Sequence, residues 1–350
     1  MTDDRYSRQA LFSGIGADGQ ARIGQRRVLV VGAGALGSAA LDMLARAGVG
    51  RIRFVDRDTV ELSNLQRQCL YDEADALEGA PKAECARRRL AAVNRDVGLE
   101  PLALDLHAGN VRAVTEGVDL ILDATDNFET RYLLNDASVA FGIPWIYAAV
   151  VGSYGMTFTI LPGRTGCLRC VIPDLPPPGS SPTCDTAGVI APAVAAVSAY
   201  AVAEALKILA GKEDALQPGI WHLDVWERSG YRMEVGSPDP GCPACARQEF
   251  PFLAGDGAGA ALTLCGRNAV QVRPAPSRNG SEAPEALLPS LAARLRRLPE
   301  IRGSLRVTPH ILQFETGDRR LVVFPDGRTI VHGGSDPAEA RSLVARYIGA

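Results

Sequence analysis

A glycine-rich turn and a later carboxylate carry the clearest chemistry in this sequence. Gly32, Gly34 and Gly37 have G-x-G-x-x-G spacing directly after the apolar run 28–31, and helix-forming residues follow. A strand, a tight turn and a helix N-terminus in that order present backbone N–H groups to a phosphate. Asp56 ends the next apolar run, about 20 residues on, where a carboxylate can bind a ribose hydroxyl. These features predict a nucleotide site, although alone they also fit an NAD or FAD enzyme.

The polar run after Asp56 favours a triphosphate over a dinucleotide. Residues 63–68 read Ser-Asn-Leu-Gln-Arg-Gln, and Lys82 follows a proline at the start of a predicted helix. Arg67 offers a forked donor set and Lys82 a compact charge, and both suit phosphate oxygens. A nicotinamide-dependent oxidoreductase has no need of this run, so that alternative leaves residues 63–67 unexplained.

Two aspartates follow another predicted strand. Asp123 and Asp126 come at and after the end of the apolar run 120–122. In a doubly wound sheet the carboxyl ends of the strands face the ligand, and carboxylate oxygens beside phosphates suit Mg²⁺. A turn or helix N-cap at Asp126 and Asn127 fits the same residues equally well.

Four of the eight cysteines stand in two Cys-x-x-Cys pairs, Cys167/Cys170 and Cys242/Cys245. Two such turns present four thiolates, which suits a closed, structural Zn²⁺ site with no position left for a substrate water. Four reduced thiols or two disulfides are the alternatives.

The elements that must position these residues alternate along the chain. Apolar runs alternate with helical stretches through residues 28–125, which predicts an α/β fold with a doubly wound, mostly parallel sheet and a Rossmann-like nucleotide site. Residues 5–26 read as a helical arm, and the proline-rich run 171–186 as a mobile loop. We expect one domain over residues 1–254 and a small C-terminal α+β domain over 255–350. The predicted elements are strands 28–31, 52–55, 99–104, 120–124, 145–151, 156–161, 261–264, 269–272, 310–315, 320–324 and 329–331, and helices 38–47, 82–94, 110–116, 130–141, 191–210, 285–297 and 337–347.

Composition excludes some classes of protein. The 350 residues carry a net charge of −3 with a pI of about 5.9, which gives no support to nucleic-acid binding. The N-terminus has no apolar stretch of the kind found in signal peptides, so we expect a cytoplasmic protein. The longest apolar stretch, 187–203, contains a proline and runs into charged residues, and we interpret it as a buried helix rather than a membrane span.

Several motifs together resemble the ThiF/MoeB/HesA family, relatives of the ubiquitin-activating enzymes. The resemblance covers about residues 5–250 and includes both cysteine pairs. It is carried by Arg5-Tyr6-Ser7-Arg8-Gln9, by the run from Asp56 to Gln68, by Asp123-Ala124-Thr125-Asp126-Asn127 and by Cys184-Asp185-Thr186-Ala187-Gly188-Val189. The family often has glycine where this chain has Ala33 or Ala35.

The resemblance implies ATP-dependent adenylation of a protein carboxylate. The substrate is the C-terminal Gly-Gly tail of a small ubiquitin-fold sulfur carrier, favoured here as the thiamine thiazole type, with a molybdopterin-synthase carrier as the alternative. A separate sulfur donor is implied, since no sulfurtransferase domain is apparent. By resemblance, the residues beside the nucleotide include Asn64, Gln66 and Asn127, with Asp126 on Mg²⁺. The resemblance also implies a homodimer in which Arg8 reaches the partner's site, and a Cys184 that links to the activated carrier.

Overall fold

A computed structural model describes residues 4–177, 184–217, 219–255, 261–264, 269–272 and 284–349, without the side chains of 4, 184–185, 261–264, 284–286 and 302. The chain divides into two compact units, Met1–Gly257 and Ala258–Ala350. Each is described separately below.

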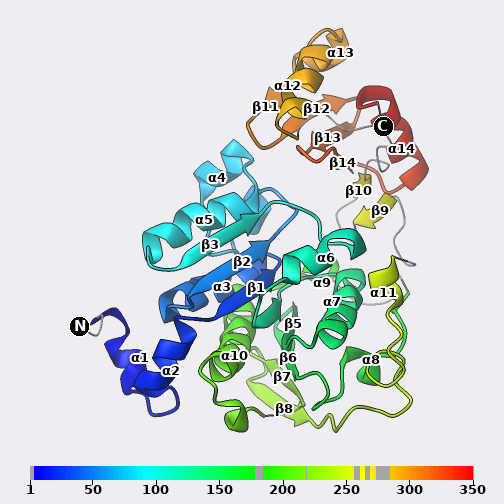
Figure 1. Cartoon of the computed structure of the whole chain (residues 1–350). Helices are drawn as coiled ribbons and strands as arrows, with labels where there is room; N and C mark the ends of the chain where they lie inside the picture. Colours follow the sequence, from blue (N-terminus) through cyan, green and yellow to red (C-terminus); the bar gives the residue numbers. More distant parts are fainter. Residues whose placement is uncertain are drawn as a thin grey trace. The chain divides into compact units, whose positions relative to one another are not determined.

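The first unit is built on one eight-stranded sheet (Figure 1). Its strand order is β3-β2-β1-β4-β5-β6-β7-β8. The first five strands pair in parallel and the last three extend the sheet in antiparallel fashion. The predicted doubly wound, mostly parallel sheet is therefore confirmed. The strands are β1 (Arg27–Val31), β2 (Arg51–Val55), β3 (Gly98–Leu102), β4 (Leu120–Asp123), β5 (Trp145–Val151), β6 (Tyr154–Ile160), β7 (Ile220–Asp224) and β8 (Ser229–Met233).

Side chains of the central strands alternate between two cores on the two faces of the sheet. In β1, Val28 and Val30 pack into one core, while Leu29 and Val31 pack into the other. Burial on both faces explains why the central strands read as continuous apolar runs.

Helices cover both faces of this sheet (Figure 1). The core that includes Val28 is closed by α3 (Ala35–Ala47), α5 (Lys82–Val93) and α10 (Ala191–Leu209). The opposite core is closed by α6 (Ala108–Thr115), α7 (Phe128–Phe141), α8 (Leu168–Val171) and α11 (Pro251–Ala254). The remaining helices of this unit are α1 (Ser7–Leu11), α2 (Gly16–Ile23), α4 (Glu73–Glu78) and α9 (Cys184–Ala187).

The long apolar helix α10 meets the length and composition expected of a membrane span, with a mean hydropathy of 1.5 over its most apolar window. Half of that window is buried inside the fold, and Ala193, Val197 and Ala201 are buried in the same core as α3. Core helices of globular proteins pass the same test, so this helix is weak evidence for a membrane.

The second unit has its own six-stranded sheet, in the order β11-β12-β13-β14-β10-β9, with every pairing antiparallel. Its buried cluster joins Phe314 and Leu321 of the sheet to Leu291 and Val344 of two helices. The strands are β9 (Ala261–Leu264), β10 (Ala269–Val272), β11 (Arg306–Val307), β12 (Leu312–Thr316), β13 (Arg319–Val323) and β14 (Thr329–His332), and the helices are α12 (Pro284–Leu295), α13 (Pro299–Arg302) and α14 (Pro337–Tyr347).

Candidate nucleotide and metal sites

The order of the parallel strands creates a switch point between β1 and β4. From β1 the chain passes through α3 to β2 on one side, and from β4 it passes through α7 to β5 on the other. Ligands of open α/β sheets bind at the carboxyl ends of the two strands where the order reverses. Val31 ends β1 and is paired with Asp123, which ends β4, so the glycine turn and the aspartate segment start side by side.

The three glycines of the turn have different roles. Gly32 has a φ of +93°, and a Cβ there would lie 2.7 Å from the Ala124 carbonyl oxygen. A Cβ on Gly37 would lie 1.9 Å from the Gly32 carbonyl oxygen, so α3 packs directly on the turn. Around Gly34 the space is open, because only the amide nitrogen of Gln68 comes within 4 Å of a Cβ built there, at 3.8 Å. Gly32 and Gly37 thus allow close packing, whereas Gly34 leaves room for a ligand.

Asp56 holds the turn to the end of β2. Its carboxylate accepts the N–H of Ala33 at 2.7 Å through one oxygen and the N–H of Asp58 at 2.7 Å through the other. Burial raises the pKa of Asp56, and the nearby Lys82 opposes that shift. Each carboxylate oxygen keeps a second lone pair, so the predicted ribose contact is compatible with these bonds.

Lys82 is almost completely buried, with 2% of its surface exposed. Its ammonium group lies 3.5 Å from a carboxylate oxygen of Asp58, and its backbone N–H donates to the Asp58 carbonyl at 2.9 Å. A buried lysine is unusual unless it is paired or used by a ligand. The Lys82 ammonium is thus connected to the glycine turn through two aspartates. It pairs with Asp58, whose N–H donates to Asp56, and Asp56 accepts the N–H of Ala33 in the turn. Asp58, which the sequence reasoning did not select, is its ion-pair partner.

The polar run after Asp56 is held largely by its own backbone. Asn64 is buried and its amide oxygen accepts the Glu61 N–H at 3.1 Å. The half-buried Arg67 donates to the Ser63 carbonyl at 2.8 Å, and the exposed Gln66 lies 3.5 Å from the Val189 carbonyl oxygen. Gln68 is buried, and its amide oxygen has no hydrogen-bond partner among the described residues.

The aspartate segment combines a buried and an exposed carboxylate. Asp123 is fully buried, and one oxygen accepts the N–H and hydroxyl of Thr125 at 2.8 and 2.7 Å. Its other oxygen lies 3.9 Å from Arg131, and burial raises the pKa of Asp123 to about 6. Asp126 is exposed in the loop that follows. Asn127 caps α7 by accepting the Thr130 N–H at 2.9 Å, which is the alternative that the sequence left open for this pair.

Two predicted residues lie away from these contacts. Arg8 is exposed on α1 and forms no ion pair with other described residues. Cys184 begins α9, and its side chain lies outside the described residues, as do residues 178–183 of the predicted mobile loop. The described start of that loop is anchored, since the Tyr132 hydroxyl lies 2.8 Å from the Ile172 carbonyl oxygen and 2.6 Å from that of Asp174.

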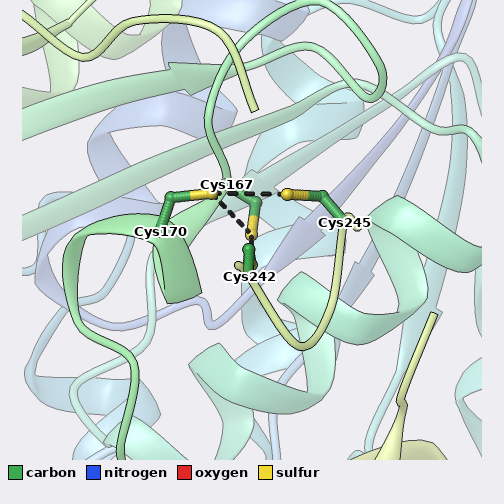
Figure 2. Close-up of side chains that lie close together, drawn as sticks. All are labelled: Cys167, Cys170, Cys242 and Cys245. Carbon is green, nitrogen blue, oxygen red and sulfur yellow. Dashed lines mark hydrogen bonds between the residues drawn. The ribbon is translucent and has the colours of Figure 1, made fainter. Parts of the chain in front are cut away.

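The four paired cysteines converge on one point (Figure 2). All four sulfurs lie within 4.8 Å of one another, and the shorter separations are 3.6 Å for Cys167 and Cys242, 3.8 Å for Cys167 and Cys170, and 3.3 Å for Cys170 and Cys245. A tetrahedral ion with Zn–S bonds of about 2.3 Å places its sulfurs about 3.8 Å apart. None of the four is in a disulfide. The group therefore fits the predicted zinc site and not the two disulfides.

The metal group joins two distant segments of the first unit. Cys167 and Cys170 lie at α8, between β6 and β7, whereas Cys242 and Cys245 lie in the segment between β8 and α11. Burial and the neighbouring thiols raise the pKa of Cys167 to about 12. A bound divalent ion would deprotonate these thiols and supply the attraction that holds the segments together.

Comparisons with known proteins agree with this geometry. The sequence model of the ThiF family matches residues 6–244. The sulfur carrier protein ThiS adenylyltransferase of Bacillus subtilis is 45% identical over 349 residues, which cover 99% of both chains. The sulfur carrier protein adenylyltransferase of Thermus thermophilus is 41% identical over 69% of this chain and 90% of its own.

Among solved structures, the fold is similar to that of Escherichia coli MccB in complex with MccA-N7isoASN. The TM-score is 0.63 with 24% identity, over 70% of this chain and 75% of that one. This likeness confirms the fold and carries no further argument about substrates.

Proposed function

This chain belongs to the ThiF family, and from that premise we propose that it is a sulfur carrier protein adenylyltransferase acting on a ThiS-type carrier. The observation that carries the proposal is the 45% identity to the Bacillus subtilis ThiS adenylyltransferase along the whole chain, second unit included. The reaction transfers the AMP part of ATP to the C-terminal glycine carboxylate of the carrier and releases pyrophosphate.

The arrangement of the first unit suits this chemistry. The open side of Gly34 and the N-terminus of α3 would offer N–H donors to the phosphates of ATP, and the Asp56 carboxylate would accept from a ribose hydroxyl. Lys82 and Arg67 supply positive charge beside them. A carboxylate oxygen of the carrier attacks the α-phosphorus, the bond to the bridging oxygen breaks, and pyrophosphate leaves with that electron pair.

No general base is required, because the attacking carboxylate is already ionised at neutral pH. Catalysis then rests on alignment of the carboxylate with the α-phosphorus and on stabilisation of charge in the transition state. The buried ammonium of Lys82 is suited to the second task, since a charge held in place needs no reorganisation when the reaction occurs.

Magnesium is expected on Asp126, where it would neutralise phosphate charge. The exposed Asp126 carboxylate follows the β4 strand end, and the buried Asp123 has one oxygen without a hydrogen-bond partner among the described residues. Both carboxylates are hard oxygen donors of the kind that Mg²⁺ prefers. Zinc would fill the group that includes Cys167 and Cys242 and hold the two segments together.

Further parts of the proposal concern assembly. We place Arg8 in the site of a second copy, in a homodimer, because it is exposed on the arm and unpaired with other described residues. Mixing an Arg8→Ala chain with a chain inactivated at Lys82 should restore part of the activity. The Cys184 thiolate would attack the carbonyl carbon of the acyl-adenylate, forming a thioester with the carrier and releasing AMP, before a separate sulfur donor acts. We expect the protein to work in the cytoplasm.

Carrier-dependent exchange of radioactive pyrophosphate into ATP tests the function. We expect exchange with magnesium and a thiamine-type carrier, and much weaker exchange with a molybdopterin-type carrier or with a ThiS-type carrier lacking its last glycine. Exchange with the molybdopterin-type carrier alone would move the enzyme to that pathway. NADH binding without exchange would overturn adenylation altogether.

A further inference from the structure

Tyr71 lies beside the glycine turn, outside the motifs that the sequence reasoning used. Its hydroxyl donates a hydrogen bond of 2.6 Å to the carbonyl oxygen of Ala33. Both residues are buried, with Tyr71 7% exposed and Ala33 fully enclosed. Burial raises the pKa of Tyr71 well above its usual range, so the hydroxyl keeps its proton and remains a donor at all working pH values.

The Ala33 backbone is therefore held at both of its polar groups. Its N–H donates to Asp56 at 2.7 Å, and its carbonyl accepts from Tyr71. This double restraint lies between Gly32 and Gly34, two residues whose backbone can adopt many conformations. Without a restraint, the peptide that joins Ala33 to Gly34 could turn either way.

The orientation of that peptide decides where the Gly34 N–H points. In a trans peptide the carbonyl and the N–H point in opposite directions, and the described chain has no cis bond. Because the Ala33 carbonyl points to Tyr71, the Gly34 N–H points away from it. No described residue accepts that N–H, and the space around Gly34 is open.

We propose that Tyr71 is a positioning residue that fixes the Ala33–Gly34 peptide so that the Gly34 N–H donates to a phosphate of ATP. The inference rests on the proposed function for the identity of the ligand. The Tyr71 hydrogen bond also connects the polar run that carries Arg67 to the glycine turn, because Tyr71 follows that run by only a few residues. One hydroxyl would thus hold both phosphate-binding segments in register.

Replacing Tyr71→Phe removes one oxygen and keeps the ring in the core. We expect the KM for ATP in pyrophosphate exchange to rise about tenfold, with kcat changed less than about twofold, because the Gly34 contact serves ground state and transition state alike. Calorimetry without carrier should show a similar loss of ATP affinity. Adenosine, which has no phosphate, should bind as tightly as to the unchanged enzyme.

Tyr347→Phe is the matched control. Tyr347 is also a buried tyrosine, and its hydroxyl forms a hydrogen bond of 3.0 Å with the hydroxyl of Thr316 in the second unit. It should lower the melting temperature without changing the KM for ATP. Equal losses of ATP and adenosine affinity in Tyr71→Phe, or an unchanged KM, would overturn the proposal.

The outcome is separable from that of the proposed function. If the unchanged enzyme binds ATP but catalyses no pyrophosphate exchange with any carrier, the proposed function is wrong. The comparison of ATP and adenosine binding still tests the role of Tyr71. If Tyr71→Phe does not fold, the amide resonances of glycine-labelled native enzyme provide the second test. ATP should then shift the Gly34 amide and adenosine should not, and equal shifts would contradict the role of Tyr71.

Discussion

Replacing Lys82→Met separates the structural role of this buried ammonium from its role in catalysis. Methionine is an unbranched side chain that lacks only the terminal ammonium position of lysine, so it keeps most of the length at the start of α5 but carries no charge. The ammonium lies 3.5 Å from Asp58, with exposed fractions of 2% for the Lys82 side chain and 14% for that of Asp58. Removing it takes away the positive charge that pairs with Asp58 and acts on Asp56.

The pair geometry sets the size of the effect on stability. Two unit charges at that separation attract by about 5 kcal/mol at an effective dielectric constant of about 20. The cost of burying the ammonium offsets much of this, and breaking a buried pair typically costs about 3–5 kcal/mol. Because Asp58 keeps some contact with water, we expect Lys82→Met to destabilise the first unit by about 2–3 kcal/mol.

A second change isolates that cost. In the double variant Lys82→Met with Asp58→Asn, an uncharged amide replaces the Asp58 carboxylate, so we expect about 1–2 kcal/mol of the lost stability to return. The three tryptophans, Trp145, Trp221 and Trp226, all lie in the first unit, so their fluorescence during denaturant unfolding reports on that unit.

Pyrophosphate exchange gives the other half of the result. Loss of a cation that stabilises transition-state charge should slow exchange by at least about a hundredfold. This loss should persist in the double variant although its stability improves. Exchange that recovers together with stability would show that Lys82 only neutralises the carboxylates, and the catalytic reasoning would be refuted.

Three further predictions concern the metal group, the turn and the buried carboxylate. Cys242→Ser should lower zinc in metal analysis from about one ion per chain to well below that, whereas Cys69→Ser, outside the group, should leave it unchanged. Gly37→Ala should destabilise the first unit strongly, since its Cβ would lie 1.9 Å from the Gly32 carbonyl oxygen, while Gly34→Ala should unfold normally but bind ATP weakly; equal unfolding curves for the two would contradict the packing argument. The folded pKa of Asp123, about 6 against an ordinary 3.8, means that stability falls as pH rises through this window, by up to about 3 kcal/mol. Asp123→Asn should lack this fall when unfolding is measured at about pH 4 and pH 7, and an identical pH dependence would disprove it.

The parallel half of the sheet could be predicted from the sequence because its strands are buried on both faces. The predicted ranges 28–31, 52–55 and 120–124 lie within one residue of the observed β1, β2 and β4, and 145–151 matches β5. Here local apolar composition and tertiary position agree.

The antiparallel extension carries a weaker signal. Strands β7 and β8 were not predicted, and every residue of β8 is exposed. Its sequence, Ser-Gly-Tyr-Arg-Met, has no apolar run or alternation, and the strand exists because it pairs with β7 at the sheet edge. Pairing of this kind depends on tertiary context rather than on local propensity.

The same distinction applies to the site. Spacing alone predicted the glycine turn and the cysteine group, since a few neighbouring residues define each one. The contacts that hold the glycine turn and Lys82 in place could not be predicted from local spacing. Tyr71 and Ala33 are 38 residues apart in the chain, and Asp58 and Lys82 are 24 apart. Asp58 lies in the sequence between the predicted site residues Asp56 and Asn64. It could have been recognised as the carboxylate that a buried Lys82 requires as its ion-pair partner.

The residues that we propose for adenylation all lie in the first unit. The glycine turn, Lys82, the aspartate segment and the cysteine group all belong to the first unit, and the family match ends at residue 244. The Thermus thermophilus relative is matched over 90% of its length by 69% of this chain, which leaves it no room for a second unit of this size. The Bacillus subtilis relative, in contrast, is matched along 99% of both chains. The second unit has its own buried cluster around Phe314 and Leu321, and it is a part of the chain that the match to the Bacillus subtilis relative includes and the match to the Thermus thermophilus relative does not.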